Sequence, residues 1–138
     1  MLSRRAFGVC AICAVAGFAA SGVEAQAQGT QTGGVKRIII QKTELPGDKY
    51  VTILAVAEIP PGTTVARHTH PGVESSYVLE GEGELLVQGQ PVRQVKASDG
   101  FQIPPEIPHS ARTGDKSMKV AVTYVVEKDK PLSSPAPE

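Results

Sequence analysis

The residues most able to do chemistry form one pattern: His68-Thr69-His70, then Glu74, then His109, and this pattern contains every histidine of the chain. Imidazole nitrogens and carboxylate oxygens are common protein ligands of divalent transition metals. Four such ligands leave one or two positions open on a five- or six-coordinate ion, as a catalytic metal requires. We therefore predict a metal site at His68, His70, Glu74 and His109. The ligand set suits Mn, Fe, Co, Ni, Cu or Zn and does not choose among them.

The spacing also indicates how strands would position these ligands. Residues 68 and 70 lie two apart, so on a strand their side chains point to the same face. Pro71-Gly72 predicts a turn, after which Glu74 begins the next strand. His109 follows 35 residues later, which is far enough to come from another strand. In a barrel, the shared face can be the interior, where a metal is shielded from water.

Glycine and proline turn signals recur every eight to twelve residues, with short Val-, Ile- and Tyr-rich runs between them. This pattern is typical of an all-β sandwich or barrel. The predicted strands are 50–58, 63–70, 74–80, 84–88, 92–95, 101–103, 109–112 and 118–126. Gly81-Glu82-Gly83 predicts a hairpin turn, with Glu80, Glu82 and Glu84 as a solvated face rather than a paired-carboxylate site.

These residues resemble the first motif of the cupin family: Gly62, five residues, His68-Thr69-His70, three residues, Glu74, six residues and Gly81. The second cupin motif matches less closely. Ser98-Asp99 stands for the usual Gly-Asp, Pro104 and His109 are in place, and Glu106 and Thr113 replace a usual glycine and asparagine. The departures affect the loop more than the ligand His109. The resemblance implies a small, single-domain cupin of the type-2 kind, folded as a jelly-roll β-barrel.

The resemblance also implies a function for the metal site. Oxygenases are the leading class, so we expect a metal-dependent, dioxygenase-like enzyme that acts on a small organic molecule. A cupin lyase or isomerase and a non-catalytic module that binds a small ligand are the alternatives. Glu74 is the one group beside the metal that could also move a proton, and is therefore the candidate catalytic residue. Single-domain cupins commonly dimerise through sheet edges, which predicts a homodimer.

Strand parity extends the prediction to the neighbours of the ligands. With Glu74 facing inward, Ser76 and Val78 face inward as well, whereas Tyr77 and Leu79 face outward. The same argument places Ala66 inside and the side chains of Arg67 and Thr69 outside. Arg67 could clamp a substrate carboxylate, but parity favours an exposed or interface role. Core or interface packing is expected for the three tyrosines, Tyr50, Tyr77 and Tyr124.

The N-terminus predicts export of the protein. Ser3-Arg4-Arg5-Ala6-Phe7 gives a positive start, residues 6–22 are apolar or small, and Val23-Glu24-Ala25 offers a cleavage site. Residues 1–25 are therefore expected to be a signal peptide, which makes the mature protein periplasmic or secreted. Arg4-Arg5 resembles a twin-arginine signal, with the ordinary secretory route as the equal alternative. Both cysteines lie in this segment, so the mature chain would have none.

The mature chain divides into a flexible leader over 26–34, a cupin β-barrel domain over 35–127 and a disordered Pro/Ser tail over 128–138. Without the signal segment it has 12 basic and 13 acidic residues, with no basic block. We therefore expect no nucleic-acid partner. We also expect no stable membrane span after processing, since the apolar run of the signal is short.

Overall fold

A computed structural model describes residues 29–32 and 34–137, so the predicted signal peptide lies outside the described residues. The described residues form ten strands and no helix, and none of them belongs to a helix that could cross a membrane. The strands are β1 (Gly29–Thr32), β2 (Val35–Glu44), β3 (Tyr50–Ile59), β4 (His68–Thr69), β5 (Gly72–Val87), β6 (Arg93–Lys96), β7 (Gly100–Ile103), β8 (His109–Arg112), β9 (Met118–Glu127) and β10 (Ser134–Pro135). The predicted all-β class is confirmed.

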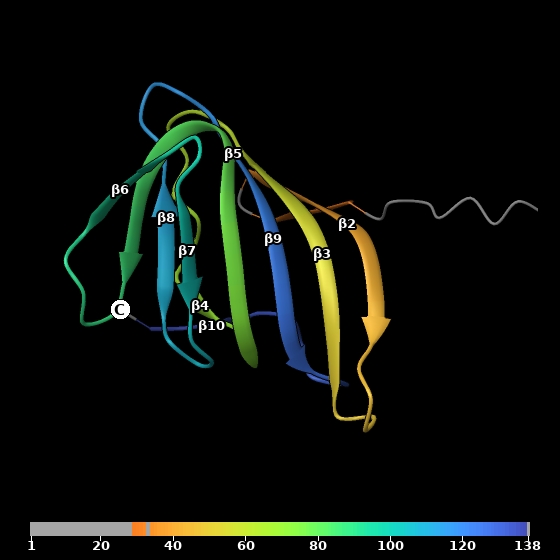
Figure 1. Ribbon diagram of the computed structural model, residues 1–138. Helices are drawn as coiled ribbons and strands as arrows, with labels where there is room; N and C mark the ends of the chain where they lie inside the picture. The colour runs from red at the N-terminus through yellow and green to blue at the C-terminus, as the bar shows by residue number, and fades with distance from the viewer. Residues whose placement is uncertain (1–28, 33, 138) are drawn as a thin grey trace, which may run out of the picture.

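The strands form one strongly curved sheet in the order β1-β2-β3-β9-β5-β8-β4-β10, with β6 and β7 also paired to β5. Figure 1 shows two walls that face each other, one built around β2, β3 and β9 and the other around β6 and β8. The green β5 arches between them, since its first half pairs with β9 and its second half with β6 and β8. This curled half-barrel agrees with the predicted jelly roll.

The core lies on the concave face of the sheet and follows from period-two alternation. On β9, the alternate residues Met118, Val120, Val122, Tyr124 and Val126 are buried, and the residues between them are more exposed. β3 contributes Val51, Ile53 and Ala55 to the same core. The predicted inward Ser76 and Val78 are buried, and Tyr77 and Leu79 are exposed, so parity holds along β5.

The predicted hairpin at Gly81-Glu82-Gly83 is wrong, because β5 runs through these residues as a single strand of 16 residues. The register of β5 against β9 shifts between Val78 and Glu80, and Gly81 has a φ of 78°. The glycines therefore bend the strand from one wall to the other instead of ending it. Glu82 and Glu84 pair with Lys116 and Arg112 on the surface, as a solvated face would.

The predicted strand over 63–70 is also too long, since only His68 and Thr69 form β4. Residues 63–67 are irregular apart from an isolated bridge between Thr64 and Arg112. Parity therefore fails here: Ala66 is exposed, and Arg67 is half-buried instead of facing freely outward.

The two ends of the described chain also contain short strands, within the segments for which the sequence predicts a flexible leader over 26–34 and a disordered tail over 128–138. Gly29–Thr32 form β1 on the edge of β2, and β2 itself lies outside the predicted strands. In the tail, Ser134 and Pro135 pair with Thr69 and His68. Proline has no N–H to donate to a neighbouring strand. An edge strand tolerates it where this side of the residue faces away from the sheet.

The outer face of the wall built around β2, β3 and β9 carries exposed apolar side chains. Leu54, Tyr77 and Val125 are 40%, 49% and 38% exposed, and Tyr50 at 38% likewise lies outside the core. Of the three tyrosines, only Tyr124 is a core residue. Exposed apolar patches often mark protein interfaces. The homodimer stays a prediction, which sedimentation analysis of the purified protein would test.

Replacing Gly81 by alanine should destabilise the protein strongly. A Cβ at this position would lie 1.8 Å from the backbone oxygen of Ser117, so the backbone at the bend of β5 would have to move. Gly89 is the matched control, because its φ of 76° is nearly the same and no atom lies within 4 Å of its Cβ position. G89A should lower the free energy of unfolding by about 1–2 kcal/mol, the cost of a left-handed backbone conformation for a residue with a Cβ. G81A should lower the free energy of unfolding by at least about 2 kcal/mol more. Urea denaturation would measure both, and equal losses would contradict the steric argument.

Candidate metal centre

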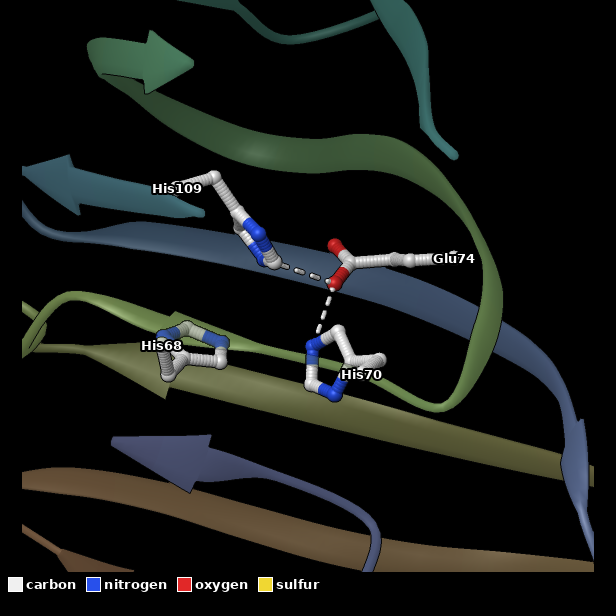
Figure 2. A group of neighbouring side chains, drawn as sticks. All are labelled: His68, His70, Glu74 and His109. Carbon is white, nitrogen blue, oxygen red and sulfur yellow. Dashed lines mark ion pairs between the residues drawn. The ribbon is translucent and has the colours of Figure 1, made fainter. Parts of the chain in front are cut away.

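The fold brings the four predicted ligands together. One ligand atom from each of His68, His70, Glu74 and His109 lies within 4.8 Å of all the others. Figure 2 shows the Glu74 carboxylate pointing between the rings of His70 and His109. His68 lies beside them on β4. His70, Glu74 and His109 are only 2%, 7% and 3% exposed, and His68 is half-buried. A set of this kind could hold a divalent ion.

Strand pairing explains why these residues meet. His68 on β4 pairs directly with His109 on β8. Glu74 on β5 lies opposite Tyr124 on β9, so both side chains point to the concave face. Gly72 permits this approach, since a Cβ there would lie 2.0 Å from the backbone oxygen of Val125. The turn at Pro71-Gly72 thus brings β5 against β9 and directs Glu74 toward the histidines.

Each imidazole is oriented by a hydrogen bond to a backbone carbonyl. The Nδ1 atoms of His68, His70 and His109 lie 2.8, 2.6 and 2.9 Å from carbonyl oxygens. The respective carbonyls belong to Ala66, Leu132 and Ile107. A carbonyl only accepts, so Nδ1 carries the proton and a neutral ring has its free lone pair on Nε2. Such hydrogen bonds at Nδ1 fix the tautomer and the orientation of a histidine ring that binds a metal through Nε2.

The Nε2 atoms then face a group that also only accepts. They lie 2.9 Å (His70) and 3.3 Å (His109) from Oε2 of Glu74. Within the described residues, these two Nε2 atoms are buried and have no hydrogen-bond partner. Lone pairs at such distances require a positive charge between them, either a proton or a metal ion. The donor set therefore fits a divalent transition metal, held by three imidazoles and one carboxylate.

The electrostatics of the cluster favour the metal-binding forms of Glu74 and His68. Burial alone would raise the pKa of Glu74, but its contacts with His109, His70 and Ser76 lower that pKa well below the usual range. The Ser76 hydroxyl donates to Oε1 of Glu74 at 2.7 Å and fixes the carboxylate. Burial lowers the pKa of His68 to about 4, so this ring stays neutral in mildly acidic solution.

A cavity opens beside the cluster, lined mainly by apolar side chains such as Val35, Ile59, Leu85 and Phe101. Besides three of the ligands, its polar lining includes Arg37, Ser110 and Tyr124. The ring of Tyr124 stands edge-on to His70, with centroids 4.8 Å apart. Burial and the charge of Glu74 raise the pKa of the Tyr124 phenol, so it keeps its proton.

Arg37 and Tyr124 are the cavity residues that the sequence patterns did not single out for chemistry. Tyr124 is in the core as expected, yet its pairing with Glu74 puts it at the site. Arg37 lies on β2, which lies outside the predicted strands. The available signal was the spacing of Val35, Arg37 and Ile39, which lie two residues apart and so share one face of a strand. That strand is β2, in which Arg37 pairs with Ala57 of β3.

Fold and site together define a class of protein. The family model described as "Cupin domain" matches residues 55–126, just over half of the chain. The chain therefore belongs to the cupin family, as its motif predicted.

Similar proteins include an enzyme. Dimethylsulfoniopropionate lyase DddQ from Ruegeria pomeroyi is 33% identical over 69 residues, which are 50% of this chain and 34% of DddQ. The crystal structure of DddQ has a TM-score of 0.69 at 23% identity and covers 81% of this chain and 64% of DddQ. The polyketide cyclase RemF from Streptomyces resistomycificus has a TM-score of 0.62 at 21% identity, with 82% of each chain covered. This chain spans less than two thirds of DddQ, and at these identities the structural likenesses show the fold alone.

The full chain is expected to bind one divalent transition metal ion per molecule. A His68→Ala/His70→Ala double variant should lose it, because two of the three imidazoles are gone. Elemental analysis of the purified proteins would measure the metal content. Gln102→Ala is the control, since Gln102 is exposed and bonds only Ser75 on the surface. Stoichiometric metal in the double variant would contradict the assignment.

The C-terminal segment should contribute to metal affinity, because the carbonyl of Leu132 holds Nδ1 of His70. Deleting residues 131–138 should weaken binding roughly 10- to 100-fold, the usual effect of losing an outer-shell partner. Deleting only residues 137–138 is the control. Competition titration against a chelating dye would give both affinities, and equal values would show that the tail does not support the site.

Proposed function

We propose that this cupin is a metal-dependent lyase that cleaves a small organic substrate by elimination in the cavity beside His68, Glu74 and His109. The observation that carries the proposal is the preset cluster, in which three imidazoles and a carboxylate converge at a cavity. The similarity to DddQ over 69 residues supports a lyase in particular. Dimethylsulfoniopropionate is therefore the first substrate to test.

The chain's own residues supply binding, orientation and a proton acceptor. His68, His70 and His109 would hold the metal, with Glu74 as fourth ligand. When bound, the metal would act as a Lewis acid that stabilises negative charge developing on the substrate. The apolar walls exclude water, which strengthens every electrostatic interaction within the cavity.

Elimination needs a base that takes a proton from the carbon adjacent to the one that bears the leaving group. The electron pair of that C–H bond then forms a C=C bond, and the neighbouring C–S bond breaks with the sulfide as leaving group. Glu74 lines the cavity beside the candidate metal position, so its carboxylate is the group placed to accept this proton. Tyr124 keeps its proton and can donate a hydrogen bond to the substrate.

An oxygenase, expected from the sequence as the leading class, uses the same kind of ligand set. Three imidazoles and a carboxylate suit redox-active metals as well as zinc. The similarity to a lyase moves our preference to elimination, and a non-catalytic binding role is the remaining alternative. Oxygen uptake separates the oxygenase from the other two.

We also propose that the protein works outside the cytoplasm, in the periplasm or as a secreted protein. Support comes from the arginine pair, the apolar run and the small residues at Val23-Glu24-Ala25. N-terminal sequencing of the exported protein should begin at Gln26, and an intact Met1 in that fraction would contradict cleavage.

The metal-loaded protein should release dimethyl sulfide from dimethylsulfoniopropionate, measurable by gas chromatography of the headspace. Glu74→Gln should lower the rate about 100-fold or more, because the proton acceptor is lost. Metal content must be measured in the same samples, since Glu74 is also a ligand. Glu84→Gln is the control, because Glu84 lies on the surface and pairs with Arg112. Oxygen consumption without dimethyl sulfide would favour the oxygenase, and neither product with full metal would favour a binding module.

A further inference from the structure

A second cavity, here called the outer cavity, adjoins the metal cavity. Both are lined by Val35, Arg37, Val65 and His68, so the two lie side by side. Its outer wall is formed by Arg67, by the irregular segment before β4 and by Ser133 and Pro135 of the tail. A molecule that approaches the metal site through this outer cavity passes both arginines.

The outer cavity has two cationic side chains and no acidic one in its lining. Neither Arg37 nor Arg67 makes an ion pair within 4.0 Å among residues 29–32 and 34–137. In that same part of the chain, the Nε atoms of both are buried without a hydrogen-bond partner. Burying a charged donor without an acceptor costs free energy. An anion would remove this cost.

The two guanidinium groups are held in place by different contacts. The guanidinium carbon of Arg37 lies 5.8 Å from the ring centroid of Tyr124, the residue opposite Glu74. Arg67 donates from Nη2 to the side-chain oxygen of Gln88 at 2.7 Å. These contacts orient the side chains and leave the Nε donors unused. Arginine presents its donors as a planar fork that matches a carboxylate.

We propose that Arg37 and Arg67 recognise the carboxylate group of a small organic acid and so set the specificity of the site for anionic substrates. The inference rests on the proposed function only in taking this anion to be the substrate. The carboxylate binds between the arginines, and the rest of the molecule reaches the inner cavity beside His68 and Glu74. An uncharged amide of the same shape gains much less from the two cations.

Direct binding tests the pair independently of turnover. The metal-free full chain is titrated with propionate and with propionamide, which differ in charge but hardly in shape, and NMR shift changes give the affinities. Propionate should bind at least about tenfold more tightly, because its charged oxygens accept stronger hydrogen bonds from the arginines than an amide does. Arg37→Met and Arg67→Met, which keep much of the apolar stem, should each lose about tenfold in propionate affinity and leave propionamide binding unchanged.

Two further variants keep the test decisive. Arg93→Met is the control, because Arg93 is exposed, lies outside both cavities and donates to the Gly100 carbonyl. It should bind propionate as the original chain does. Arg37→Lys keeps a charge without the planar fork and should give an intermediate affinity, even if Arg37→Met does not fold because Arg37 packs on Tyr124.

Equal affinity for propionate and propionamide, no measurable propionate binding, or unchanged propionate binding in both Arg→Met variants would overturn the inference. The result is separable from the proposed function. Arginine-dependent propionate binding with no lyase activity overturns only the lyase assignment. Lyase activity with a KM that is unchanged in both variants overturns only the role of the arginines.

Discussion

The structure depends on one buried constraint: Oε2 of Glu74 faces the Nε2 atoms of His70 and His109, so that a proton or a metal ion must lie between them. Backbone carbonyls fix the protons of the three rings on Nδ1, and Nε2 of His70 lies 2.9 Å from Glu74. Without a cation, buried lone pairs would oppose each other at a cost of free energy. The cluster is therefore a preorganised receptor for positive charge, and the surrounding fold must resist its relaxation.

The fold provides this resistance mainly through β5. Its first half brings Glu74 against β9, and its second half pairs with β8, whose first residue is His109. The same strand thus fixes two ligands, and the bend at Gly81 sets the angle between them. Close backbone contacts at Gly72 and Gly81 leave no room for side chains, so the bend is determined by packing as well as by conformation.

The clustering of the four candidate ligands could be predicted from the sequence because metal chemistry restricts both residue type and spacing. Parity correctly placed Ser76 and Tyr77, since β5 is a regular strand on both sides of its bend. The glycines at 81 and 83 were misleading because glycine permits a turn and a strand bend equally well. Local sequence does not say which occurs, since that depends on the long-range contact with Ser117.

The residues that we propose to determine substrate choice were the least visible in the sequence, and for a physical reason. Arg67 lies in a segment without strand alternation, so parity could not place it, and Arg37 belongs to a strand that the turn signals did not reveal. Both line a cavity whose wall includes Ser133 and Pro135, which the sequence predicted to be disordered. Metal ligation selects a few residues of fixed type, whereas a recognition surface can be assembled from any segments that the fold brings together. In this cupin the candidate metal ligands are therefore recorded in a motif, whereas the proposed anion site depends on tertiary contacts between β2, an irregular loop and the tail.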